Sequence, residues 1–119
     1  MSRKILLLIL LVTGCISQVY TAEEAQQIAA DYIRDAPTYK FDGIPKTFKV
    51  TSVEPVDCEG FFEVIIEFDS AYPGYGTRSV YFLIKKISHH TARVRVEKGQ
   101  VTEAVLDDLW DEMAQESLV

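Results

Sequence analysis

The sequence predicts an α+β fold, with one N-terminal helix packed on a four- to five-stranded antiparallel meander and a short helix at the C-terminus. Two observations lead to this prediction. Apolar residues first recur with the period of an α-helix and then with the two-residue period of β-strands. Glycine and proline residues separate the later segments, as they do at turns between antiparallel strands. With 119 residues, the chain has room for one domain.

The main helix is predicted to begin at Thr21, because Thr21 and Glu24 have the spacing of a capping box. Apolar side chains then follow on one helical face: Ala25, Ile28, Ala29, Tyr32 and Ile33. Pro37 is expected to end the helix, since proline disfavours helical geometry in the residue before it. Residues 37–45 are expected to form a loop with a turn at Asp42 and Gly43.

Strand-type alternation accounts for most of the remaining chain. The predicted strands are residues 46–55, 62–69, 79–87, 92–97 and 101–106. The second is the clearest, because its apolar residues share one face: Phe62, Val64, Ile66 and Phe68. The third carries apolar residues on both faces and is expected to be central in the sheet. Lys98 and Gly99 are expected to form a tight turn, and Asp107 and Asp108 to cap the last helix.

The N-terminal residues have the features of an export signal. Arg3 and Lys4 precede an apolar run over residues 5–12. A bilayer span needs about 20 apolar residues, whereas the apolar part of a signal peptide needs only about 7–15. At the end of the apolar run, the four residues Val12-Thr13-Gly14-Cys15 resemble the lipobox of prokaryotic lipoproteins.

The lipobox resemblance implies that a diacylglyceryl group is attached to the sulfur of Cys15 and that the chain is cleaved before it. Residues 1–14 are then a signal peptide, residues 15–20 a tether and residues 21–119 the single domain. The protein would be held on the extracytoplasmic face of the cell membrane, because two acyl chains give stable anchoring. The alternative is ordinary secretion, with Cys15 paired to Cys58 in a disulfide.

The charge of the chain makes nucleic acid an unsuitable partner. The formal net charge is −6, from 18 acidic and 12 basic residues, and loss of Arg3 and Lys4 leaves 10 basic against 18 acidic, or −8. A protein with this balance repels a phosphate backbone. The expected partners are the membrane, through lipid on Cys15, and a cell-envelope protein or peptide. No cofactor-binding motif and no nucleophile motif is present in the sequence.

Four residues are candidates for binding a ligand: Tyr72, Tyr75, Arg78 and His90. The first three lie on a glycine-shaped loop, which can hold a sugar, a peptide or a carboxylate. Alternatively, the tyrosines of this loop only pack over the end of the sheet. His89 and His90 are expected to point to opposite sides of an extended chain, which disfavours a shared metal ion.

The acidic residues Asp107, Asp108, Asp111 and Glu112 lack the spacing of a calcium loop, and the favourable dipole of a helix start explains them.

Several short segments together resemble a family of small, functionally uncharacterised lipoproteins and secreted proteins of archaea and some bacteria. The segments are APTYKFDGI (36–44), GYGTR (74–78), HTA (90–92), GQV (99–101), AVLD (104–107) and WDE (110–112). Thr77 stands where that pattern usually has an aspartate, and His89 where it usually has a proline, so any site inferred from these two loops is weakened. The resemblance implies a fold and a location but brings no activity with it.

The order of the predicted elements is also similar to PepSY-type and cystatin-like domains, which associate with peptidases or inhibit them. Analogy at the level of fold does not carry function. We therefore expect a lipid-anchored, extracytoplasmic binding or protein-interaction module. The alternatives are a peptidase-regulating, inhibitor-like domain and a small extracytoplasmic hydrolase. The hydrolase would use His90 with a C-terminal carboxylate such as Asp111, and it requires these two side chains to lie within hydrogen-bond reach.

Overall fold

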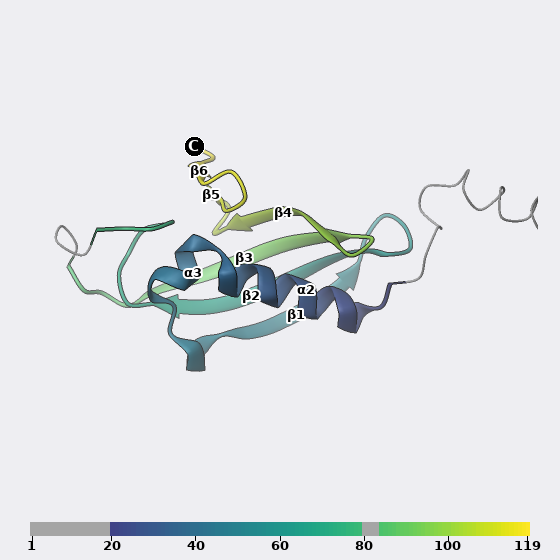
Figure 1. Cartoon of the computed structure of the whole chain (residues 1–119), viewed down its shortest axis with the longest axis horizontal. Coiled ribbons are helices and arrows are strands. Elements are labelled where there is room, and N and C mark those ends of the chain that lie inside the picture. The colour runs from purple at the N-terminus through teal and green to yellow at the C-terminus, as the bar shows by residue number, and fades with distance from the viewer. Residues whose placement is uncertain (1–19, 80–83) are drawn as a thin grey trace, which may run out of the picture.

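A computed structural model describes residues 20–79 and 84–119, and it confirms the α+β class (Figure 1). Two α-helices, α2 (Ala22–Asp35) and α3 (Pro37–Asp42), are followed by the 3-10 turn η2 (Pro45–Thr47). The strands are β1 (Lys49–Pro55), β2 (Phe61–Ser70), β3 (Ser88–Glu97), β4 (Gln100–Leu106), β5 (Trp110–Asp111) and β6 (Glu116–Ser117). They form one open sheet in sequence order, and each strand is antiparallel to its neighbours.

Helix α2 begins as the sequence predicts. The Glu24 N–H donates to Thr21 Oγ1 at 3.1 Å, and the Thr21 N–H donates to Glu24 Oε1 at 2.9 Å, which together make the capping box. The helix lies across one face of the sheet and contacts β1 to β4 (Figure 1). Its buried side chains are Ala25, Ala29, Ala30 and Ile33. Because three of these are alanines, the helix can approach the sheet closely.

The core lies between α2 and the covered face of the sheet. Along β2, buried residues alternate with half-buried ones, which confirms the predicted apolar face: Phe62, Val64, Ile66 and Phe68. Strand β3 adds Ala92, Val94 and Val96 to the same core, and β4 adds Ala104 and Leu106. The turn at Lys98 and Gly99 is also present, and both residues have positive φ.

Residues 37–45 were expected to form a loop, but most of them form α3 and η2. Pro37 occupies the first turn of α3, where its fixed φ suits a helix and its missing N–H costs nothing. Gly43 follows α3, and a Cβ at this position would overlap the ring of Tyr39. The proline that ends one helix therefore begins the next.

The prediction of a third strand over residues 79–87 is wrong for the residues that the structure describes. Ser79 and residues 84–87 have no strand conformation, and residues 80–83 lie outside the described chain. The two edges of β2 are already paired with β1 and β3, from Phe61 opposite Glu97 to Ser70 opposite Ser88. A further strand cannot pair between β2 and β3. His89 and His90 consequently lie within a strand rather than in a turn.

The predicted C-terminal helix is also wrong. Asp107 and Asp108, its expected caps, have φ values of 55° and 59°, and this left-handed conformation does not lead into a right-handed helix. The chain instead turns into the short strands β5 and β6, which extend the sheet beyond β4.

The predicted signal peptide and most of the tether, including Cys15, lie outside the described residues. Tyr20, the last tether residue, packs against the core. Cys58 lies in the turn between β1 and β2 and is not a free cysteine. None of the helices that the structure describes is long and apolar enough to cross a membrane.

Candidate functional site

The four candidate ligand-binding residues lie at one end of the sheet, where the segment 71–79 leaves β2. Tyr75 and His90 are in contact, with ring centroids 5.3 Å apart. Arg78 instead points toward α3, and the Tyr72 N–H donates to Asp42 Oδ2 at 2.7 Å. The structure therefore brings these residues to the same region but gives most of their polar atoms partners within the protein.

Arg78 ties the segment 71–79 to α3. Its guanidinium forms an ion pair with Asp42, and the side chains are only 8% and 7% exposed. The guanidinium also donates to the carbonyl oxygen of Gly76 and lies 4.6 Å from the ring centroid of Phe41. A buried pair of this kind holds its position firmly, because separating it leaves an unpaired charge out of water.

Thr38, on α3, links this segment to the C-terminal part of the chain. Its N–H donates to Glu112 Oε2 at 3.0 Å, and its hydroxyl donates to Glu112 Oε1 at 2.7 Å. The same hydroxyl accepts the Gly76 N–H at 2.7 Å. Thr38 and Glu112 are almost fully buried. The carboxylate of Glu112 is therefore a structural anchor for the first turn of α3.

A third group of contacts has the connectivity of a catalytic triad. His90 Nδ1 lies 2.7 Å from Asp107 Oδ2, and His90 Nε2 lies 3.2 Å from Ser70 Oγ. A base that bridges a carboxylate and a hydroxyl in this way can activate the hydroxyl for nucleophilic attack. Ser70 is fully buried, however, and its one hydroxyl hydrogen is donated to the carbonyl oxygen of Tyr72 at 2.9 Å rather than to His90. Substrate could reach Ser70 only if the segment 71–79 moved away.

Asp107 is the centre of this third group. It also accepts the Tyr75 hydroxyl at 2.8 Å and the Thr91 N–H at 2.8 Å. Burial, the largest influence, would raise the pKa of Asp107, but the hydrogen bonds from His90, Thr91 and Tyr75 outweigh it and lower the pKa. For Tyr75, burial and then the bond to Asp107 raise the pKa to about 12. Both shifts favour a charged carboxylate beside a neutral phenol.

We call these three groups the buried polar cluster. It comprises Thr38, Asp42, Ser70, Tyr75, Arg78, His90, Asp107 and Glu112. The expectation that a helix start explains the acidic residues is wrong, because two of them, Asp107 and Glu112, accept hydrogen bonds within the cluster. Asp111, the expected partner of His90, instead accepts the N–H groups of Met113 and Ala114. The position of His90 had a local signal, since it is in phase with Ala92, Val94 and Val96 on the covered face of β3.

His89 points to the opposite face, as expected from the strand geometry. Its Nδ1 lies 2.8 Å from Asp69 Oδ1, and its Nε2 lies 3.2 Å from Glu67 Oε1. The hydrogen bond to Asp69 raises the pKa of His89, against a smaller opposing effect of burial. Within residues 20–79 and 84–119, no three His, Cys, Asp or Glu side chains are grouped as metal ligands.

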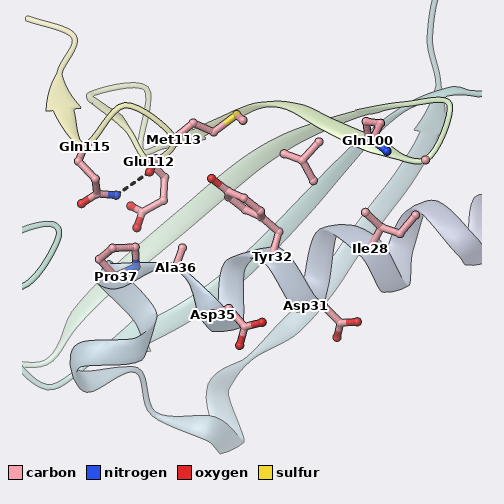
Figure 2. Close-up of a pocket in the computed structure, with 12 residues that line it drawn as sticks. Ile28, Asp31, Tyr32, Asp35, Ala36, Pro37, Gln100, Glu112, Met113 and Gln115 are labelled. Atoms are coloured by element: carbon pink, nitrogen blue, oxygen red, sulfur yellow. Dashed lines mark hydrogen bonds between the residues drawn. The ribbon is translucent and has the colours of Figure 1, made fainter.

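An open concave surface lies beside β4, and it has two parts. The first, which we call the helix groove, has a volume of about 750 Å³ and lies between α2 and the chain at residues 99–101 and 112–115. Figure 2 shows Tyr32 reaching from α2 toward β4, with Met113 above it. Asp31 and Asp35 form the rim on the side of the helix away from β4.

The second part, the edge groove, lies on the opposite face of the sheet beside β4. Its volume is about 770 Å³, and its lining includes Arg95, Glu97, Thr102, Glu103, Asp111 and Met113. A third pocket, of about 220 Å³, is formed by the turn at residues 55–59. None of these three pockets is lined by Tyr72, Tyr75, Arg78 or His90.

Comparison of the chain with models of protein families, with curated proteins and with solved structures gave no match. The fold and the side chains described above are therefore the basis for the functional proposals that follow.

Proposed function

We propose that this protein is a lipid-anchored, extracytoplasmic binding module whose ligand occupies the helix groove. The observation that supports binding is a difference in solvent access between the buried polar cluster and the helix groove. The buried polar cluster satisfies most of its polar atoms internally, with Arg78 Nε as an exception, whereas the helix groove exposes apolar and hydrogen-bonding surface together. A groove of several hundred cubic ångströms with a few polar groups is typical of ligand sites.

Lipid anchoring is proposed from the sequence of residues 1–15. A thioether-linked lipid and a disulfide to Cys58 compete for the same sulfur atom of Cys15, so one measurement distinguishes them. Full-length protein made in a bacterial host with the lipoprotein-processing enzymes is separated by detergent-phase partition, and its intact mass is measured. We expect the protein to enter the detergent phase. Its mass should equal that of the chain cleaved before Cys15 plus the added lipid.

The matched variants are Cys15→Ser and Cys58→Ser. Under the lipid proposal only Cys15→Ser releases the protein from the membrane, and Cys58→Ser keeps the lipid mass. If wild-type protein instead has a mass two hydrogen atoms below that of the thiol form, with no lipid added, Cys15 is in a disulfide and the anchoring proposal is wrong.

Ligand binding in the helix groove can be tested with a set of small drug-like fragments. We expect the fragments that bind to shift the NMR signals of the Met113 and Ile28 methyl groups. Gln100→Trp, which places a large side chain in the groove, should abolish these shifts. Gln26→Trp, an exposed position of α2 outside the groove, should leave them unchanged. Fragments that bind only elsewhere would contradict this assignment.

A second candidate function is hydrolysis, and the contacts among Ser70, His90 and Asp107 are the observation that favours it. A fluorophosphonate probe reacts with an activated serine hydroxyl and would label Ser70 if the segment 71–79 opens. Labelling that is lost in Ser70→Ala and in Asp107→Asn would establish the hydrolase. If wild-type protein remains unlabelled while a known serine hydrolase in the same sample reacts, the cluster is structural.

A further inference from the structure

Strand β4 is only partly covered along its outer edge. Its inner edge pairs with β3 except at Thr102, where the register shifts, and β5 pairs only with Val105 and Leu106. The Glu112 N–H donates to the Ala104 carbonyl oxygen at 2.8 Å. Within the part of the chain that the structure describes, residues 100–103 have no strand on this side. Main-chain N–H and C=O groups on such an edge can pair with another extended chain.

The helix groove and the edge groove flank this uncovered edge on its two faces. Both grooves include Met113, whose side chain is 44% exposed. Successive side chains of an extended peptide point to opposite faces of the sheet. A strand paired with residues 100–103 would therefore place alternate side chains into the two grooves, which is how strand addition obtains specificity.

The two grooves differ in chemistry. The helix groove offers apolar surface from Ile28, Tyr32 and Met113, and its acidic residues Asp31 and Asp35 lie at the rim. The edge groove is mainly acidic, since it is lined by Glu97, Glu103 and Asp111, with Arg95 as its basic residue. Arg95 pairs with Glu97 and Asp57, and Glu103 pairs with Arg93 at 3.4 Å, so carboxylates still outnumber cations in this groove. This arrangement suits a strand with apolar side chains on one face and basic side chains on the other.

The geometry points to strand addition: we propose that residues 100–103 of β4 bind an extended segment of a partner protein in which apolar and basic residues alternate. The apolar residues enter the helix groove and the basic residues enter the edge groove. This inference names the ligand class for the proposed binding module and rests on that proposal.

The opposite edge of the sheet makes a useful contrast. Strand β1 is also an edge strand, and both β1 and β4 have a register shift, so the contrast comes from the residues at the ends of β1. Lys49 and Pro55 stand at its two ends, and both residue types discourage strand pairing at an edge. The cation of Lys49 would also repel a basic segment. We therefore expect pairing at β4 and not at β1.

The probe is a blocked heptapeptide in which lysine and valine alternate, added to the full-length, isotope-labelled protein in detergent micelles. Two peptides serve as controls: one with glutamate in place of lysine, and one with proline in place of valine, which removes main-chain donors. We expect the lysine–valine peptide to slow amide hydrogen exchange within residues 100–103 and to give cross-strand NOEs to β4. Neither control peptide should do so.

Charge variants separate the proposed site from general attraction to an acidic protein. Glu103→Gln, in the edge groove, is expected to weaken binding about 2- to 5-fold, as for other exposed charge contacts. Glu54→Gln, on the edge strand β1, removes the same charge and should leave the affinity unchanged. Equal effects of the two variants would show that only the net charge matters and would overturn the inference.

The remaining outcomes each identify a different occupant of the edge. Protection of residues 100–103 that grows with protein concentration, without peptide, means that a second copy of the chain pairs there. Protection that is independent of both peptide and concentration means that another part of the same chain covers the edge. Either result overturns the inference. If fragments bind in the helix groove but the peptide does not pair with β4, the binding module stands and strand addition is wrong.

Discussion

The buried polar cluster and the two grooves beside β4 contain similar side chains but differ in what those side chains contact. In the cluster, carboxylates meet protein donors: Asp107 accepts from three groups, and Asp42 pairs with Arg78. In the grooves, Met113 is 44% exposed, and Tyr32 is partly buried against the core but lines the open groove. Glu112 belongs to both regions, since it lines the helix groove while Thr38 holds its carboxylate. The contacts among Ser70, His90 and Asp107, which most resemble catalytic machinery, are thus less accessible to solvent than the grooves.

This difference predicts that substitutions in the cluster change stability, whereas substitutions in the grooves change binding. The predictions below test this separation, beginning with the largest expected effect.

Arg78→Met should destabilise the fold most, by about 3–5 kcal/mol, because it leaves Asp42 buried without its cation. Denaturant unfolding measures the change. Arg34→Met is the matched control, since Arg34 is 47% exposed and its pair with Asp31 is at the surface; we expect it to cost less than about 1 kcal/mol. Arg78→Met combined with Asp42→Asn should recover part of the loss. Similar effects of Arg78→Met and Arg34→Met would show that the buried pair is unimportant.

Thr38→Val should cost about 1–3 kcal/mol, because it keeps the shape of the side chain but removes its hydroxyl. Glu112 loses one donor, and the Gly76 N–H loses its acceptor. Thr51→Val provides the control, since the Thr51 hydroxyl makes only one bond at an exposed position. The two variants can be compared by their denaturation midpoints. An equal change in both would mean that the link from α3 to the C-terminal segment contributes no stability.

The sequence predicts the regular part of the fold well, for reasons that are local. The cap of α2 depends on residues three apart, and the buried face of β2 depends on alternation along one strand. The cluster depends on pairs such as Thr38 and Glu112, which are 74 residues apart, and no local pattern reports such a contact. The third strand was misassigned because residues 79–87 have strand-like alternation, although β2 already had a partner on each edge.

Tyr75 should make the free energy of unfolding depend on pH in the alkaline range. Its pKa is raised from 10 to about 12 in the folded protein, so folding favours the neutral phenol. This contribution is fully present below pH 10 and is lost as the pH rises from about 10 through about 12. Tyr75→Phe should remove it, and the stability difference between wild type and variant should narrow over that range. Unfolding experiments at several pH values measure the difference. A constant difference would show that burial and the bond to Asp107 do not raise the pKa of Tyr75.

Met113→Ala should have the smallest effect on stability, below about 1 kcal/mol, although it removes a large apolar side chain. Met113 is 44% exposed, so truncation leaves a wider groove rather than a sealed cavity, and the cavity contribution to destabilisation is absent. Leu106→Ala makes the contrast, because Leu106 is only 1% exposed and its truncation should cost about 2–5 kcal/mol. If Met113→Ala destabilised the protein as much as Leu106→Ala, Met113 would be part of the core. With stability retained, any loss of fragment or peptide binding by Met113→Ala reports on the grooves themselves.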